Sequence, residues 1–426
     1  MAKKDIKKQK AQKPISRKQK DSSSLFDVLN NFLFRRSTII FWMLFAAITI
    51  ISLLLFDVKA SIGGDDSSYI LSAYNFVHDF AYPGGWEGAL YPIFLSPFVW
   101  LFGINLPLLK SLSLVCMLIS FGLFYVAYKK YIPPFVLFFS MLILAVNAHL
   151  LYFSSQTYTE AFFIMIQAIL FLIVNKYFIS DEKETIELKK DYKKFLLLGF
   201  VLVIVSLTKN IGLASMIAVF AYFIIIKYWK SFLLTVFSSA LFMLPFEVLK
   251  RNIWTQSGFQ IKSQGSGLLY KDFYNPARGY EDFWGFIQRL IDNSNLYLSK
   301  HLYILLGLKS EISISPVLTI VTYLIFFISL IAIFKRNKYL LFAGIYVGMM
   351  CLTTFISIQK MWDSERLIIV YLPYILVFLF GGVYYILSKE KLKKLQFLLL
   401  LLMVFLFFGS MKVTMPLMDN QSKILK

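Results

Sequence analysis

Long apolar runs recur from one end of the 426-residue chain to the other, and they restrict its fold more than any other feature. Hydrophobic residues make up 58% of the sequence, whereas charged residues make up only 16%. A helix that crosses a bilayer needs about 20 consecutive, mostly apolar residues. The runs are continuous rather than alternating, which argues against a transmembrane β-barrel. The sequence therefore predicts an all-α polytopic membrane protein.

Hydropathy predicts about eleven transmembrane helices, each near the usual length or somewhat shorter. Their expected ranges are 38–56, 108–128, 132–148, 161–179, 195–208, 210–226, 231–249, 314–334, 339–358, 366–386 and 396–411. The apolar run 89–103 differs from these because it is short and contains two prolines. It fits an interfacial helix in the first outer loop better than a span.

The basic residues favour a cytoplasmic N-terminus. The formal net charge is +20, and we expect residues 1–37 to form a basic, disordered cytoplasmic tail. Attraction to the lipid bilayer explains this tail better than nucleic-acid binding, because it directly precedes a span. The later basic loops fall on the same side only if 89–103 does not span. The expected organisation is a transmembrane domain at 38–411, with outer loops at 57–107, 149–160 and 250–313 and a short outer tail at 412–426.

Two adjacent carboxylates, Asp65 and Asp66, follow the first span directly. Like charges repel each other, so the pair needs a reason. One interpretation is a solvated acidic loop in which Asp66 caps a helix that begins near Ser67. The other is a functional site at the outer membrane surface. Position alone does not decide between them.

The residues that follow the pair form a pattern. "DDSSYILSA" is followed by "YPIFLSPFVWLFG", and this arrangement resembles the polytopic GT-C glycosyltransferases. The similar branch contains the protein O-mannosyltransferases and the lipid A aminoarabinose transferase. The matching residues are Asp65, Asp66, Tyr69, Ala73, Tyr91, Pro92 and Leu101–Gly103. The resemblance extends over roughly the first 225 residues and again near 359–380, and it does not cover 250–313.

The resemblance implies a lipid-linked sugar donor, a transfer that inverts the anomeric carbon and a set of site residues. Asp65 corresponds to the acidic residue that acts as base or site organiser, and Asp66 is a second acidic position. Tyr69 and Tyr91 become candidates for contact with the substrate. The chemistry is consistent with this, since a polyprenyl phosphate is already a good leaving group. Transfer then needs a base for the acceptor hydroxyl and cations for the departing phosphate.

Glu160 is the second acidic candidate, at the junction of the second outer loop and a span. The family places an acidic residue at this junction, which implies a catalytic role. The alternative is a carboxylate favoured at a helix N-terminus by the helix dipole.

Lys209 lies at the tip of a helical hairpin whose two ends are both basic. The first arm has about fourteen residues, or roughly 21 Å of helix, against a hydrocarbon layer of roughly 30 Å. The lysine should therefore lie below the outer surface, where it needs an anionic partner such as a lipid phosphate. The alternative is a side chain that snorkels towards the headgroups.

Arg366 is the second candidate for binding the donor phosphate. It resembles a late segment of the family, in which an arginine precedes an apolar helix with a proline about seven residues on, here Pro373. The family's usual tyrosine after the arginine is Leu367 in this chain. The alternative is an ion-paired cluster with Asp363 and Glu365 at the membrane boundary.

Other residues give weaker signals. The three histidines, His78, His149 and His301, have no metal-binding spacing, so we do not predict zinc. Adjacent carboxylates could hold Mg²⁺ or Mn²⁺, but nothing in the sequence requires a divalent cation. The outer loop 250–313 is rich in aromatic residues, which could form a sugar-stacking surface, an interfacial surface or ordinary packing.

The sequence therefore predicts an inner-membrane glycosyltransferase. It would move a hexosyl or pentosyl unit from a polyprenyl-phosphate donor to an extracytoplasmic lipid, glycan or protein acceptor. A transporter or flippase of lipid-linked sugars is the main alternative, and it would have charged residues at mid-membrane and repeat symmetry. A non-catalytic membrane scaffold is a third interpretation.

Overall fold

The computed structural model describes residues 24–59, 64–84, 88–180, 186–254, 267–308, 313–359 and 362–424. Within these ranges every regular element is a helix, apart from an isolated bridge between Tyr270 and Tyr280. The predicted all-α class is confirmed.

Seven helices among the described residues are long and apolar enough to cross a membrane. They are α2 (Ser37–Leu54), α5 (Leu106–Tyr128), α8 (Thr159–Tyr177), α11 (Trp229–Leu249) with its π-helical extension Lys250–Trp254, α15 (Pro316–Phe334), α16 (Lys338–Ser357), and α19 (Gln396–Ile424) with the 3-10 helix Glu390–Leu395 before it. An eighth span results if α6 (Pro134–Ala145) and α7 (Ala148–Tyr152) are counted together, although they are bent by 57°. The predicted polytopic membrane protein is thus confirmed, whereas the number eleven stays a prediction.

The remaining predicted spans correspond to shorter or more charged helices. Helix α9 (Leu188–Thr208) has several Lys residues and an Asp in its first two turns. Helix α10 (Leu213–Ile225) has only 13 residues, and α18 (Leu372–Leu387) has 16. The range 366–386, expected as one helix, is divided into α17 (Arg366–Ile369) and α18.

The break between α17 and α18 has a local cause. Pro373 lies in the first turn of α18, where its missing N–H costs no helical hydrogen bond. The break leaves the carbonyl of Val370 without a helical partner, and the Gln167 side chain of α8 donates to it at 2.8 Å. Gln167 in turn accepts from the Tyr346 hydroxyl at 2.6 Å. The bonds satisfy buried polar groups, which a low-dielectric interior demands.

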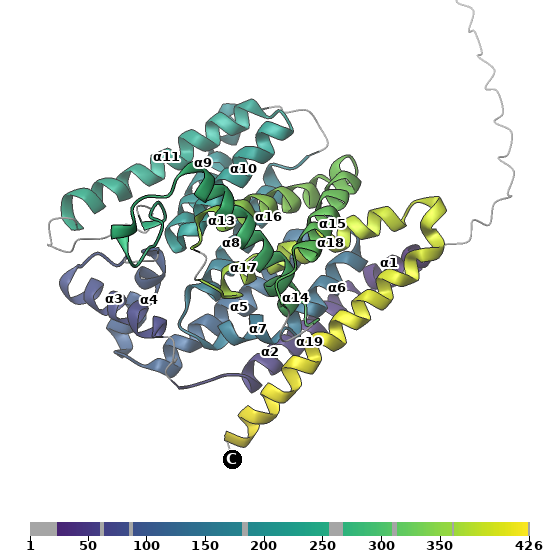
Figure 1. The fold of residues 1–426 in the computed structure, drawn as a ribbon, viewed down its shortest axis with the longest axis horizontal. Coiled ribbons are helices and arrows are strands. Elements are labelled where there is room, and N and C mark those ends of the chain that lie inside the picture. Colours follow the sequence, from purple (N-terminus) through teal and green to yellow (C-terminus); the bar gives the residue numbers. More distant parts are fainter. Residues whose placement is uncertain are drawn as a thin grey trace, which may run out of the picture.

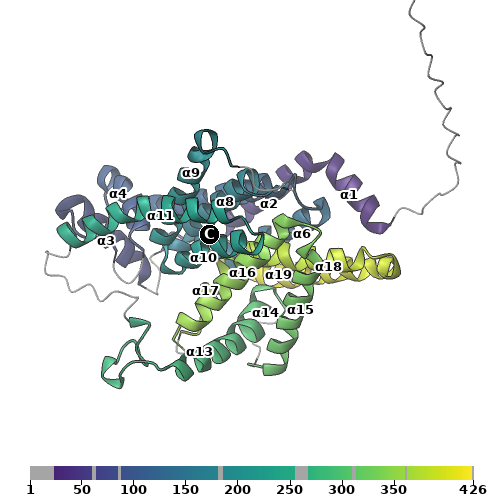
Figure 2. The ribbon, with the colours of Figure 1, turned by 90° about the horizontal axis from the view of Figure 1, so that it is seen from above.

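The segment expected as the first outer loop contains the two expected helices, α3 (Asp65–Asp79) and α4 (Leu90–Phe102), and they pack against each other. Helix α4 coincides with the run 89–103 for which an interfacial helix is predicted. Figures 1 and 2 place α3 and α4 together at one end of the molecule, and α1 (Leu25–Arg35) at the opposite end.

Helix α1 corrects the expectation that residues 1–37 are disordered throughout. Ser24 caps this helix, and its side chain and that of Asp27 form a reciprocal capping box. Phe26 is buried, with its ring stacked on Tyr384 at 4.7 Å. The first 23 residues of the expected tail lie outside the described part. At the other end α19 runs on to Ile424, so the residues expected as a short tail from 412 begin as helix.

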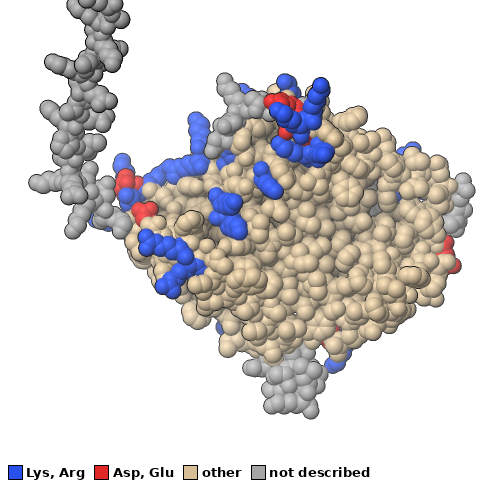
Figure 3. Space-filling view, turned by 180° about the vertical axis from the view of Figure 1, so that it is seen from behind, with Lys and Arg blue, Asp and Glu red and all other residues tan. Residues whose placement is uncertain are grey.

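The segment after α11 includes a long helix that contains a π-helical turn. It comprises α13 (Phe283–Leu296), the π-helical turn Tyr297–His301 and α14 (Leu302–Leu305), and α13 packs against α16. Seen from behind, Lys and Arg side chains gather on the upper part of the surface, and the broad area below them is almost free of charge (Figure 3). An area poor in charge is what contact with a hydrocarbon layer requires.

Candidate active site

Four charged residues from distant parts of the chain meet in one cluster, which we call the charged cluster. It consists of Asp65, Glu160, Lys209 and Arg366. Asp65 and Glu160 lie in the first turns of α3 and α8, and Arg366 begins α17. Lys209 is in extended conformation at the end of α9. The sequence singles out each of them separately, and the structure brings all four together.

Arg366 joins the two carboxylates. Its Nε donates to Glu160 Oε1 and its Nη1 donates to Asp65 Oδ2. The guanidinium also lies over the Tyr158 ring, 4.5 Å from its centroid, in cation–π geometry. Lys209 Nζ donates to the same Glu160 oxygen at 2.6 Å. One buried carboxylate therefore anchors both cations.

Exposure divides the charged cluster into a buried base and an open side. The Glu160 side chain is fully buried, whereas Lys209 is 16%, Arg366 22% and Asp65 33% exposed. A buried carboxylate alone would be very costly, and the two cations compensate for it. Two fixed cations, Lys209 and Arg366, and the carboxylate of Asp65 are therefore accessible to a ligand at the exposed side of the charged cluster.

Close backbone packing holds the hairpin that carries Lys209. A Cβ at Gly212 would lie 2.2 Å from the Val205 carbonyl oxygen, so the turn tolerates only glycine without a shift. A Cβ at Gly88 would lie equally close to the Leu207 carbonyl oxygen. Gly88, just before α4, therefore packs directly against the hairpin tip. The sequence predicts that Lys209 has an anionic partner, and in this structure that partner is Glu160.

Asp66 does not join the charged cluster, although it follows Asp65 directly. Successive helix residues point about 100° apart. Asp66 is buried, and its Oδ2 lies 3.9 Å from Nζ of Lys110 in α5. The two adjacent carboxylates thus face different cations, which reduces the repulsion that makes them conspicuous in the sequence.

Tyr69 and Tyr91 lie in helices α3 and α4, and both are buried. Their rings meet edge to face at 5.1 Å. The Tyr69 hydroxyl donates to Thr159 Oγ1 at 3.3 Å, and the Tyr91 hydroxyl lies 3.3 Å from Ser113 Oγ. In this structure they attach the first outer segment to α8 and α5 and do not line the open side of the cluster.

A second group of charges surrounds the segment before Arg366, and the sequence reasoning missed the partners of its acidic residues. Asp363 accepts from Lys300 Nζ at 2.7 Å and is 2.6 Å from His301 Nε2. Glu365 lies 3.7 Å from His149 Nδ1 and 3.8 Å from His301 Nδ1. The ion-paired interpretation therefore holds for Asp363 and Glu365, whereas Arg366 joins the charged cluster.

The protonation of this second group follows from its contacts. The contact with the His149 ring holds the pKa of Glu365 at about 2, against the opposing effect of burial. Burial lowers the pKa of His301, although Asp363 beside it acts in the opposite direction. The bonds from Lys300 and His301 outweigh burial and lower the pKa of Asp363.

A cavity of about 420 Å³ adjoins the charged cluster. Arg366, Glu365 and His149 contribute polar groups to its wall, and Val413 and Leu417 of α19 contribute apolar ones. Ligand pockets typically have volumes of about 300–1,000 Å³, so this cavity has room for a sugar.

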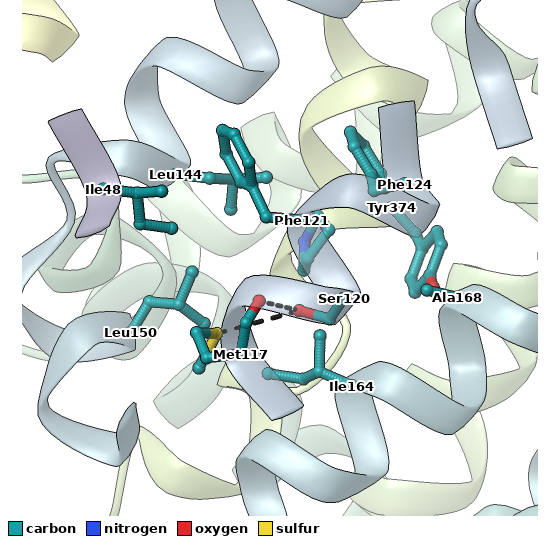
Figure 4. A pocket seen from close by; sticks show the side chains of 11 residues that line it. Ile48, Met117, Ser120, Phe121, Phe124, Leu144, Leu150, Ile164, Ala168 and Tyr374 are labelled. Carbon is teal, nitrogen blue, oxygen red and sulfur yellow. Dashed lines mark hydrogen bonds between the residues drawn. The ribbon is translucent and has the colours of Figure 1, made fainter. Parts of the chain in front are cut away.

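A separate cavity inside the bundle has only about 20 Å³. It lies between α2, α5, α8 and α18, and Figure 4 shows the mostly apolar side chains that surround it. Little more than one water molecule would fit there, so we exclude it as a substrate site.

The structure leaves two questions from the sequence open. Within the described ranges, no three His, Cys, Asp or Glu side chains are arranged to hold a metal ion. In the segment after α11, the aromatic side chains of Tyr274, Tyr280, Phe283 and Trp284 are exposed. Whether it binds sugar or the membrane interface stays a prediction.

Comparison with known proteins gives structural similarity alone. No protein-family model and no curated protein sequence matches the chain. The crystal structure of ArnT from Cupriavidus metallidurans bound to undecaprenyl phosphate aligns with a TM-score of 0.53 and 13% identity, over 80% of this chain and 59% of that one. The chain thus spans about three-fifths of the length of ArnT.

Two further structures align with lower scores. The apo state of the same ArnT has a TM-score of 0.49 and 14% identity, over 80% of this chain and 58% of that one. The archaeal oligosaccharyltransferase AglB from Archaeoglobus fulgidus, in complex with an inhibitory peptide and a dolichol-phosphate, has a TM-score of 0.48 and 10% identity, over 91% and 56%. The chain has the fold of ArnT, a GT-C glycosyltransferase, which is the fold that the residues after the first span predict.

Proposed function

We propose that this protein is a membrane glycosyltransferase that moves a sugar from a polyprenyl-phosphate donor to an acceptor hydroxyl. The observation that carries the proposal is the charged cluster, in which Asp65, Glu160, Lys209 and Arg366 converge beside a cavity of suitable size. A lipid-linked donor is supported by the undecaprenyl phosphate bound to ArnT, which shares the fold.

Lys209 and Arg366 would bind the donor phosphate. As the bond from the anomeric carbon to the phosphate oxygen breaks, the electron pair stays on that oxygen and the phosphate gains one negative charge. Two cations already fixed by Glu160 need little reorganisation to stabilise this charge, which is the main requirement of electrostatic catalysis.

Asp65 would be the base. In this structure it is bound to Arg366, and an incoming phosphate would compete with it for the guanidinium. The released carboxylate would accept the proton of the acceptor hydroxyl while the hydroxyl oxygen bonds to the anomeric carbon. Attack opposite the departing phosphate would invert the configuration of that carbon.

The proposed site faces the extracytoplasmic side of the inner membrane. The positive-inside rule supports this, since the basic loops 129–131, 227–230, 335–338 and 387–395 all fall on the side of the N-terminus if 89–103 does not span. The sugar would be a hexosyl or pentosyl unit, and the acceptor a lipid, a glycan or a protein.

The test is a turnover assay on the full-length protein in nanodiscs, with a panel of short-chain polyprenyl-phosphate sugars. Mass spectrometry would follow the release of polyprenyl phosphate. We expect release with at least one donor, and a loss of about 10²-fold or more in Arg366→Met. Arg278→Met is the matched control, because Arg278 is 67% exposed and bound only to Asp272 among the contacts described.

Two results would refute the proposal. One is equal turnover by Arg366→Met and the wild type. The other is movement of intact lipid-linked sugars across vesicle membranes without cleavage, which would identify a flippase.

A further inference from the structure

Lys110 is a fully buried lysine that the proposed chemistry does not use. It lies in the first turns of α5 and has no exposed side-chain surface. A buried ammonium is costly unless hydrogen bonds and an anion compensate for it. Such a residue calls for an explanation other than ordinary packing.

The contacts of Lys110 join two outer segments. Its Nζ donates to the carbonyl of Lys59 and, at 3.3 Å, to Gln156 Oε1, and lies 3.9 Å from Asp66 Oδ2. In the sequence, Lys59 precedes the chain segment that leads into α3, and Asp66 follows it as the second residue of that helix. Gln156 lies four residues before Glu160. One ammonium group therefore holds together the segment that carries Asp65 and the segment that carries Glu160.

Asp66 connects Lys110 to the charged cluster through the backbone. Consecutive Cα atoms are about 3.8 Å apart, so a fixed Asp66 fixes the start of α3 and with it Asp65. Asp65 is in turn bound to Arg366. A rotation of α3 that released Asp66 from Lys110 would also move Asp65 away from Arg366.

We infer that Lys110 is a positioning residue: paired with Asp66, it holds Asp65 in place for proton transfer. Asp66 then contributes through this pair and does not touch the substrate. The inference rests on the proposed function for its catalytic part. Stability alone does not explain the pair, because buried ion pairs can often be replaced by apolar residues at no cost.

The first test compares Lys110→Met with a double variant that also contains Asp66→Asn. Lys110→Met leaves the buried carboxylate without its cation, so Asp65 should be misplaced and kcat should fall about 10²-fold. KM for the donor should change little, because Lys209 and Arg366 are intact. The double variant removes both charges and should recover at least a tenth of wild-type kcat. Lys271→Met, at an exposed lysine of the outer segment, is the control.

A second readout does not depend on activity. Ala73 is a buried residue of α3, and a cysteine in its place should be protected from maleimide in an otherwise wild-type chain. Protection should be lost with Lys110→Met and return in the double variant. If no polyprenyl-phosphate sugar is turned over by the wild type, the proposed function fails, while this labelling still tests the contact.

Three outcomes would overturn the inference. Unchanged kinetics and protection in Lys110→Met would show that the pair positions nothing. A folded but inactive double variant would show that Asp66 itself takes part in the chemistry. If neither variant accumulates as folded protein, the pair is needed for stability and not for positioning.

Discussion

Asp65 and Asp66 are neighbours in the sequence but occupy different environments. Asp65 is partly exposed and bound to Arg366, whereas Asp66 is buried beside Lys110. Glu160 lies at the base of the charged cluster and anchors two cations. At the scale of single residues, the structure therefore separates the roles of Asp65, Asp66 and Glu160. The sequence groups these three carboxylates together as catalytic.

The role of Lys209 can be tested by removing its charge. A fixed cation stabilises the departing phosphate more in the transition state than in the ground state, so Lys209→Met should lower kcat by about 10²-fold. Lys209→Arg should recover part of the loss. Steady-state kinetics of release would measure this, with Lys271→Met as control. A higher donor KM at unchanged kcat would mean that Lys209 contributes only uniform binding.

At the scale of elements, the short segment before α17 decides where Arg366 lies. Lys300 and His301 bind Asp363 from the turn Tyr297–His301, and His149 binds Glu365 from α7. The partners of these two carboxylates come from two elements that are far apart in the sequence. Because these contacts hold the segment next to Arg366, the position of Arg366 should depend on the protonation of His301.

The pH dependence has a definite sign. Burial lowers the pKa of His301 from 6.5, so the unfolded chain takes up a proton before the folded protein does. Stability should therefore fall as the pH drops below about 6.5. The pKa of Glu365 falls from 4.5 to about 2, so its contribution is present above 4.5 and is lost only at lower pH.

Melting temperatures of the full-length protein between pH 5 and 7 would check this. We expect the wild type to lose stability on acidification, and His301→Gln to show a flatter dependence in this window. Glu365→Gln should not flatten the slope in this window, because Glu365 titrates below it and loss of its charge only lowers the pKa of His301 further. An equal slope in His301→Gln and the wild type would contradict the assignment.

The element boundaries show where sequence reasoning ends. The apolar runs predict most helices, because composition decides membrane insertion. They do not predict the breaks at Asn147 and Val370, since apolar residues continue on both sides. At the first, the Asn147 side chain accepts from the Leu150 N–H and begins a new helix, and at the second Gln167 satisfies the free carbonyl. Only the three-dimensional partners determine such breaks.

At the scale of the whole molecule, the four residues of the charged cluster could be identified from the sequence. Their proximity in space could not be predicted from it. Each lies at a helix end within a local motif. Arg366 and Asp65 are separated by 301 positions, and Arg366 and Glu160 by 206. Lys110 was missed because a lysine near a helix start is unremarkable until its partners are known.

The topology of the whole molecule is testable by labelling. Ser67 lies in the first turn of α3, and Glu390 begins the basic loop before α19. A cysteine at Ser67 should react with an impermeant maleimide from outside the cell membrane. A cysteine at Glu390 should react only after permeabilisation, and the native Cys116 and Cys351 are buried. The reverse pattern would overturn the orientation and the extracytoplasmic site.

The central claim is that Asp65 is a base which a bound donor phosphate releases from Arg366. The most direct measurement is donor binding and single-turnover transfer by Asp65→Asn in nanodiscs, with Asp79→Asn of the same helix as control. Asparagine keeps the size but cannot accept the proton, so transfer should fall by roughly 10²–10⁴-fold. It also no longer competes for Arg366, so the donor should bind at least as tightly as in the wild type. Near-normal transfer by Asp65→Asn would contradict the account.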